Sequence, residues 1–206
     1  MPVIEIDTPH GLARAHVHTS ADAKGALVLG HGAGGGVEAP DLVAARKAGL
    51  SARWTVVLVE QPYRVAGRRS PPPASHLDTA WIAIVEHLRA DRLQNLPVIV
   101  GGRSMGGRVA CRTVEQTGAV AVLCLAFPLE PPGRKSPQNR LPELEAVAVP
   151  VLVVQGERDP FGTPPPGPSR DVVTVPGDHG LKADPDAVAA AVGAWLARAG
   201  AGFLRL

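Results

Sequence analysis

Short apolar segments that alternate with helical patterns constrain the fold of this chain more than any other feature of its sequence. Segments of this kind are typical of strands that are buried on both faces, and such strands belong to parallel sheets. With helices between them, they predict an α/β fold, a doubly wound, mostly parallel sheet covered by helices on both faces. The apolar segments are residues 26–29, 55–59, 97–100, 120–125, 151–154 and 172–175.

The first twenty residues show a different pattern. Apolar and polar residues alternate over 3–7 and again over 13–18. This period of two predicts an antiparallel hairpin with one face toward solvent. We therefore expect an antiparallel N-terminal hairpin at the start of the sheet.

Two helices have recognisable boundaries. The first is expected after Ser75, where Asp78 stands at the spacing of a capping box and apolar residues recur at helical intervals. The second is expected to start at Asp184, with Pro185 in its first position, and to stop at Gly200. Its apolar stripe consists of Val188, Ala191, Val192 and Trp195.

A serine lies directly between the apolar segment 97–100 and a helical segment. Gly102, Ser104 and Gly106 have the spacing G-x-S-x-G. In a strained strand-to-helix turn, glycines on both sides let the backbone pack closely and direct the serine Oγ outward. The context predicts a nucleophile elbow, with Ser104 as the nucleophile.

An acid and a histidine follow this serine in the order found in α/β-hydrolases. Asp159 comes just after the apolar segment 151–154, and His179 follows the segment 172–175. In a catalytic triad, His179 would take the serine proton and Asp159 would hold the imidazole in the required tautomer. Asp178 and Glu157 are alternative acids, but consecutive side chains rarely face each other, which favours Asp159 over Asp178. Without catalysis, Asp159 would simply begin a turn before a proline, and His179 would be a loop histidine.

The glycine-rich segment 30–36 follows the first buried apolar segment. It resembles the loop that supplies one oxyanion donor in α/β-hydrolases, and we expect this donor to be the N–H of Ala33. The N–H of Met105, next to Ser104, would be the second donor. A plain glycine-rich turn is the alternative.

The same segment also matches a dinucleotide-binding pattern. Gly30, Gly32 and Gly35 satisfy G-x-G-x-x-G, and Glu60 ends the next apolar segment, where a ribose-binding acid would stand. In that fold the last glycine lies in the following helix. Here Pro40 comes shortly after Gly35 and cannot lie inside a helix, which argues against this alternative.

The loop 61–69 should lie at the carboxyl edge of the sheet, where open α/β folds bind ligands. It contains Arg64, Arg68 and Arg69, whose planar guanidinium groups suit carboxylate or phosphate. We expect at least one of them to favour a negatively charged substrate. A solvated loop is the alternative.

Composition limits the remaining functions. With 21 basic and 19 acidic residues the net charge is +2, and no basic stripe indicates nucleic-acid binding. Cys111 and Cys124 are expected to be small buried hydrophobes in a reducing compartment, without metal-ligand spacing. Neither a signal peptide nor an apolar run of the roughly 18 residues needed to cross a membrane is found. We expect one domain over 1–206, in the cytoplasm, with no cofactor, metal or membrane partner; the oligomeric state stays open.

The motifs together resemble a known family. Residues 30–35, 102–108 and 155–162 are similar to those of small α/β-hydrolase-like proteins related to dienelactone hydrolases. That family includes bacterial predicted hydrolases and, more distantly, a testis-expressed protein and a subunit of the NSL histone acetyltransferase complex. The resemblance implies the α/β-hydrolase fold and the triad Ser104, Asp159 and His179, but no substrate. Dienelactone hydrolases use a cysteine nucleophile, so Ser104 departs from them, and the short connection 126–141 leaves no room for a cap domain.

Two functions remain open. The first is a serine hydrolase that cleaves a small ester or thioester through an acyl-enzyme intermediate, with a small acyl compound as its substrate. The second is a non-catalytic protein-interaction module on an α/β-hydrolase scaffold, which the resemblance to complex subunits allows.

Overall fold

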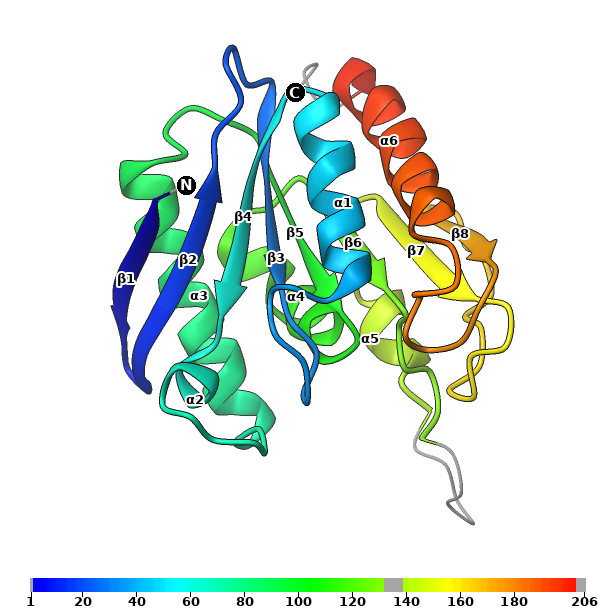
Figure 1. The fold of residues 1–206 in the computed structure, drawn as a ribbon, viewed down its shortest axis with the longest axis horizontal. Helices are drawn as coiled ribbons and strands as arrows, with labels where there is room; N and C mark the ends of the chain where they lie inside the picture. Colours follow the sequence, from blue (N-terminus) through cyan, green and yellow to red (C-terminus); the bar gives the residue numbers. More distant parts are fainter. Residues whose placement is uncertain (1, 132–138, 203–206) are drawn as a thin grey trace.

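The computed structural model describes residues 2–131 and 139–202 and contains an eight-stranded sheet (Figure 1). The strand order is β1-β2-β4-β3-β5-β6-β7-β8. The pairs β1–β2 and β2–β4 are antiparallel, and all other neighbours are parallel. This confirms the predicted mostly parallel sheet with its antiparallel N-terminal hairpin. The strands are β1 (Val3–Thr8), β2 (Gly11–His18), β3 (Gly25–Gly30), β4 (Trp54–Glu60), β5 (Val98–Arg103), β6 (Ala121–Leu125), β7 (Val151–Gly156) and β8 (Arg170–Val175).

Helices cover both faces of the sheet. In Figure 1, α1 and α6 lie together on one face, and α3 and α4 lie on the other. Each face has its own apolar cluster: Leu42 and Trp195 belong to one, and Trp81 and Val109 belong to the other. The helices are α1 (Pro40–Ser51), α2 (Pro62–Val65), α3 (Ala74–Asp91), α4 (Met105–Thr117), α5 (Leu141–Glu145) and α6 (Pro185–Gly202).

The two clusters explain why the central strands are continuously apolar. In β3, Leu27 packs into the cluster below α1 and α6, whereas Val28 packs into the cluster below α3 and α4. Every residue of β3 is buried. A polar residue at alternate positions would therefore place an unpaired group in one of the two cores.

The predicted start of α3 is wrong. The helix begins after Pro73, and this N-cap residue makes no side-chain capping hydrogen bond. Ser75 lies inside the first turn, where its carbonyl accepts a hydrogen bond from the Thr79 hydroxyl at 2.8 Å. Asp78 instead binds Arg112 of α4, with 2.9 Å between Oδ2 and Nε. An ion pair between helices has replaced the local cap, because the bidentate guanidinium is a stronger partner than a backbone N–H.

The predicted start of α6 is confirmed, and its predicted end is wrong. The Asp184 side chain accepts a hydrogen bond from the N–H of Ala187 at 2.9 Å, and Pro185 occupies the first helical position. The helix continues past Gly200 to Gly202. A single glycine within a helix costs only about 1 kcal/mol relative to alanine, which is too little to end a helix by itself.

Two further predictions concern the burial of the two cysteines and the short connection after β6, which leaves no room for a cap domain. Cys111 and Cys124 are both buried, as predicted, with 3.6 Å between their Sγ atoms. In the described parts of the connection 126–140 there is no helix or strand, and residues 132–138 lie outside the description. None of the helices in the described chain has the length and apolar character needed to cross a bilayer.

Candidate active site

Ser104 occupies the sharp turn between β5 and α4. Its backbone has φ +51° and ψ −107°, a strained combination for a residue with a side chain. A Cβ at Gly102 or at Gly106 would overlap the carbonyl oxygen of Gly30 at the end of β3. The G-x-S-x-G spacing is thus required by two close backbone approaches, as the sequence predicted.

Ser104, His179 and Asp159 form a continuous hydrogen-bonded chain. His179 Nε2 lies 2.9 Å from Ser104 Oγ, and His179 Nδ1 lies 2.8 Å from Asp159 Oδ2. The carboxylate can only accept, so Nδ1 carries the proton and Nε2 is left to accept the serine hydroxyl proton. The structure brings these three predicted residues together from the ends of three strands, and their catalytic role stays a prediction.

The Asp159 side chain is completely inaccessible to solvent and is held by several donors. Its Oδ1 accepts the N–H of Phe161 at 2.9 Å, and its Oδ2 accepts Nε2 of Gln155 at 2.7 Å. Gln155 also donates to the carbonyl of Gly162 at 2.9 Å. The sequence interpretation missed Gln155, although a polar residue that ends a buried apolar strand was its signal. The ring of Phe161 packs against that of His179, with 4.3 Å between their centroids.

The alternative acids are placed elsewhere. Asp178 Oδ1 accepts the N–H of Gly180 at 2.8 Å within its own loop, and the Asp178 side chain is exposed. Glu157 is also exposed. Neither carboxylate forms a hydrogen bond with His179 in the described structure.

The two predicted oxyanion donors border the same pocket as Ser104. This pocket, of about 340 Å³, is lined by Ala33, Ser104 and Met105 among others. The carbonyl of Ala33 accepts a hydrogen bond from the hydroxyl of Tyr63 at 2.8 Å. This contact fixes the orientation of the loop after β3. Burial raises the pKa of Tyr63 to about 12, and the phenol is protonated at neutral pH as this contact requires. The oxyanion role of Ala33 and Met105 stays a prediction.

His31 joins two loops and lies outside the chain of Ser104 contacts. Its Nε2 accepts the N–H of Gln61 at 3.1 Å, so its Nδ1 carries a proton, which it donates to the carbonyl of Gly32 at 2.8 Å. Burial lowers the pKa of His31, which keeps the imidazole neutral. His31 therefore fastens the loop after β3 to the loop after β4.

Arg103, directly before Ser104, connects three segments around the site. Its Nε lies 3.0 Å from Oδ2 of Asp41 in α1, and its Nη2 donates to the carbonyl of His179 at 3.1 Å. A Cβ at Gly32 would lie 2.7 Å from Nη1 of the same guanidinium. The Asp41 side chain has no solvent exposure, and this burial raises its pKa to about 6 although Arg103 acts in the opposite direction. The sequence interpretation missed this pair.

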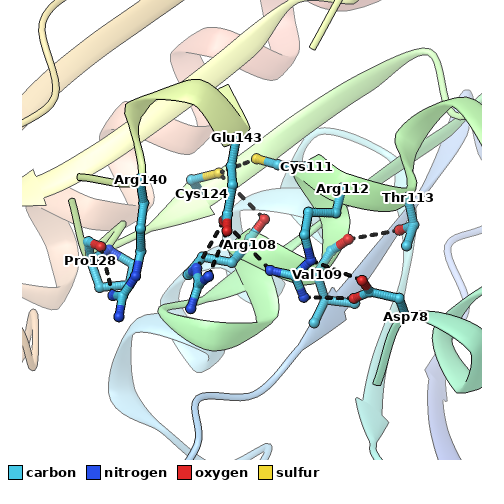
Figure 2. A network of polar contacts seen from close by, with 11 residues as sticks. Asp78, Arg108, Val109, Cys111, Arg112, Thr113, Cys124, Pro128, Arg140 and Glu143 are labelled. Atoms are coloured by element: carbon cyan, nitrogen blue, oxygen red, sulfur yellow. Dashed lines mark hydrogen bonds and ion pairs between the residues drawn. The ribbon is translucent and has the colours of Figure 1, made fainter. Parts of the chain in front are cut away.

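The three loop arginines do not line the Ser104 pocket. Arg68 lines a separate pocket of about 600 Å³ beside α2, and Arg64 and Arg69 line neither pocket. That one of them favours a negatively charged substrate stays a prediction. The arginines that do line the Ser104 pocket are Arg108, Arg112 and Arg140, which Figure 2 shows within a network of polar contacts.

The dinucleotide-binding alternative has no support in the loop after β3. The following helix begins at Pro40, so Gly35 lies in the loop rather than in a helix. Glu60 pairs with His16 of the neighbouring strand, with 2.9 Å between Oε2 and Nε2.

Comparisons with known proteins agree with this fold. Residues 23–169 match a family described as an alpha/beta hydrolase domain. No curated protein sequence matches the chain.

Several solved structures have a fold similar to that of this chain. The structure of XC6422 from Xanthomonas campestris, described as an a/b serine hydrolase without lid, has 18% identity and a TM-score of 0.75, covering 96% of this chain and 94% of that one. Est1E from Butyrivibrio proteoclasticus has 16% identity and a TM-score of 0.75, covering 96% and 98%. Dienelactone hydrolase from Anabaena variabilis has 16% identity and a TM-score of 0.70, covering 98% and 96%. At these identities the likeness is one of fold.

Proposed function

The chain belongs to the alpha/beta hydrolase domain family, and from this premise we propose that it is a serine hydrolase that cleaves a small ester or thioester through an acyl-enzyme intermediate. The observation that carries the proposal is the hydrogen-bonded chain from Ser104 Oγ through His179 to Asp159, at a strained turn. A strained φ at Ser104, the serine that is hydrogen-bonded to His179, is costly for stability, and such strain is concentrated at functional sites.

The proposed reaction begins with attack of Ser104 Oγ on the acyl carbon. His179 Nε2 takes the hydroxyl proton as the new C–O bond forms, and it returns this proton to the leaving oxygen or sulfur as the old bond breaks. Asp159 stabilises the imidazolium through Nδ1–H. A water molecule then attacks the acyl-serine with the same help from His179, which releases the acid and restores Ser104.

The negative oxygen of each tetrahedral intermediate needs donors that are already in place. The N–H groups of Met105 and Ala33 are proposed for this role, because both residues border the pocket with Ser104. A single donor of this kind contributes about 3 to 4 kcal/mol of transition-state stabilisation. Met105 is also the first residue of α4, so its N–H is not needed within the helix.

The size of the pocket supports a small substrate. About 340 Å³ lies at the low end of the volumes that hold small molecules. Apolar side chains, including Leu77 and Phe161, line it together with prolines. An acyl group of a few carbons would therefore find both an apolar wall and Ser104.

The proposal is tested by covalent labelling together with turnover. A fluorophosphonate probe should label the wild-type protein at Ser104, and p-nitrophenyl esters and acyl thioesters of increasing length should identify a substrate. Ser104→Ala should abolish both labelling and turnover, whereas Ser51→Ala, at the end of α1, should change neither. Folded wild-type protein that resists labelling and cleaves no ester or thioester would instead support the non-catalytic interaction module.

A further inference from the structure

Among the described residues, the charged side chains that line the Ser104 pocket are all arginines. Arg108, Arg112 and Arg140 line it, whereas among the described residues no aspartate or glutamate does. The other described lining residues are small or apolar: Ala33, Pro71, Pro72, Ala74, Leu77, Ser104, Met105, Pro128 and Phe161.

The carboxylates that accompany these arginines are not among the pocket-lining residues. Asp78 binds Arg112 through two contacts, of 2.9 Å to Nε and 2.6 Å to Nη2 (Figure 2). Glu143 of α5 binds Nε of Arg108 at 2.8 Å and Nη1 of Arg112 at 3.5 Å. The network thus runs from α3 through α4 to α5.

Arg108 and Arg112 differ in what they have left to donate. All three guanidinium nitrogens of Arg112 bind Asp78 or Glu143. Arg108 binds Glu143 through Nε and Nη2, and its Nη1 makes no hydrogen bond or ion pair with any described residue. Because Glu143 fixes the guanidinium plane, little side-chain entropy remains to be lost when Nη1 binds an anion.

Arg108 is also close to the nucleophile along the helix. Its N–H donates to the carbonyl of Ser104 at 3.2 Å, so the two residues are one turn apart, about 6 Å along the axis. Side chains of a helix lean toward its N-terminus, which for Arg108 is the direction of Ser104. An acyl group held at Ser104 therefore needs only a short chain to reach this guanidinium.

From this geometry we propose that the pocket selects acyl groups that carry a second, terminal carboxylate, and that Arg108 Nη1 binds that carboxylate. The proposal rests on the proposed function and names its substrate class, a half-ester or half-thioester of a short dicarboxylic acid. The carboxylate stays ionised throughout, and the bond that breaks is the acyl–oxygen or acyl–sulfur bond at Ser104. Leu77, Pro71 and Pro72 would pack against the methylene groups between the two ends.

The test compares two substrates that have the same six-carbon acyl chain and differ in the charge at its far end. The p-nitrophenyl half-ester of adipic acid is set against p-nitrophenyl methyl adipate, and the measured quantity is the ratio of their kcat/KM values. Wild-type protein should prefer the anionic ester. Arg108→Gln should lower the ratio by about ten- to hundredfold, as expected for the loss of a charge-assisted hydrogen bond. Arg198→Gln is the matched control, because this exposed arginine forms an ion pair with Asp171 at 3.0 Å and does not line the Ser104 pocket.

A second variant should act in the opposite direction. Glu143→Gln removes the negative charge that Arg108 faces, so the ratio should rise above the wild-type value. A network that only braces α3, α4 and α5 would change stability and both kcat/KM values together, leaving the ratio unchanged. Opposite shifts in Arg108→Gln and Glu143→Gln support the proposal, and an unchanged ratio in both overturns it.

Two further experiments test whether selection for charge comes from the loop arginines or acts on the leaving group. If Arg64→Gln, Arg68→Gln or Arg69→Gln lowers the ratio and Arg108→Gln does not, the proposal is overturned in favour of the loop arginines. Hexanoyl esters of 4-hydroxybenzoate and of methyl 4-hydroxybenzoate place the charge on the leaving group, and a preference seen only there also overturns it.

If wild-type protein cleaves no ester, the proposed function fails. Anion binding is then tested without catalysis, by calorimetry of monomethyl and dimethyl adipate with Ser104→Ala. Equal affinity of the two compounds overturns the proposal.

Discussion

At the scale of single residues, the position of Asp159 is set by its neighbours more than by the Asp-Pro turn that contains it. Gln155 and the N–H of Phe161 hold the two carboxylate oxygens, while His179 Nδ1 lies 2.8 Å from Oδ2. The aspartate is thus fixed as an acceptor facing the imidazole. Asp178, adjacent to His179 in sequence, is committed to its own loop.

Asp159→Asn should therefore lower kcat by on the order of 10⁴-fold while the protein stays folded, because an amide in this place favours the wrong imidazole tautomer. Asp178→Asn should cost less than about tenfold, since its carboxylate accepts the N–H of Gly180, whereas the ring is hydrogen-bonded to Asp159. Steady-state kinetics on one p-nitrophenyl ester measures both. A larger loss in Asp178→Asn than in Asp159→Asn would show that the acid has been misassigned.

Tyr63 tests the assignment of the oxyanion loop. Tyr63→Phe removes the 2.8 Å hydrogen bond to the carbonyl of Ala33 and keeps the ring. We expect kcat to fall about tenfold with little change in KM, because the N–H of Ala33 would be less well placed for the transition state only. The variant should lose about 1 kcal/mol of unfolding free energy. This loss of about 1 kcal/mol without any change in kcat would exclude the loop as an oxyanion donor.

At the scale of elements, the site is built where the ends of β3 and β5 and the start of α4 meet. The backbone at Gly102 and Gly106 lies directly against Gly30, which leaves no space for side chains. The elbow can therefore form only where β3 and β5 are neighbours, as they are in this sheet. The loop after β3, by contrast, has open space around Gly34.

Gly102→Ala should be strongly destabilising, by more than about 3 kcal/mol, because its Cβ would overlap the Gly30 carbonyl and its φ of +155° disfavours a side chain. Gly34→Ala is the matched control, with no atom within 4 Å of the added methyl group. It should change the free energy of unfolding by less than about 0.5 kcal/mol. Urea denaturation compares the two, and equal effects would contradict the requirement for glycine in the elbow.

At the scale of the whole molecule, an ion pair between the buried Asp41 and the partly buried Arg103, the residue before Ser104, joins distant parts of the chain. Asp41 belongs to α1, Arg103 ends β5, and the Arg103 guanidinium also holds the carbonyl of His179. The Asp41 pKa is raised by burial to about 6. The folded protein therefore binds a proton more tightly at this carboxyl than the unfolded chain does.

This difference predicts how stability depends on pH. Between pH 4 and 6 the folded state holds a proton that the unfolded state has lost, so the free energy of unfolding should decrease as the pH rises through this range. A shift of about two pKa units corresponds to about 3 kcal/mol. Asp41→Asn should remove this contribution, and chemical denaturation of both proteins at pH 4 to 7 measures the difference. Exposed Asp171→Asn serves as the control, and parallel pH profiles for wild type and Asp41→Asn would contradict the prediction.

The sequence by itself determined the order of the elements, the strand-helix turn at Ser104, and the positions of Asp159 and His179 after strands. These features depend on residues that are close together in the sequence. Continuous apolar runs require burial on both faces, and glycines at fixed spacing permit one particular turn. Local patterns failed where a distant partner competed, as at Ser75 and Asp78, where Arg112 replaced the expected cap.

Only the tertiary structure decided which side chains meet. Ser104 and His179 are 75 positions apart, and Arg108 and Glu143 are 35 apart. Contacts at such separations depend on which strands are neighbours and how each helix is rotated, and no local pattern of residues encodes either. For this reason the sequence indicated the arginines of the loop 61–69 as substrate-binding residues, whereas in the structure Arg108 lines the pocket that contains Ser104.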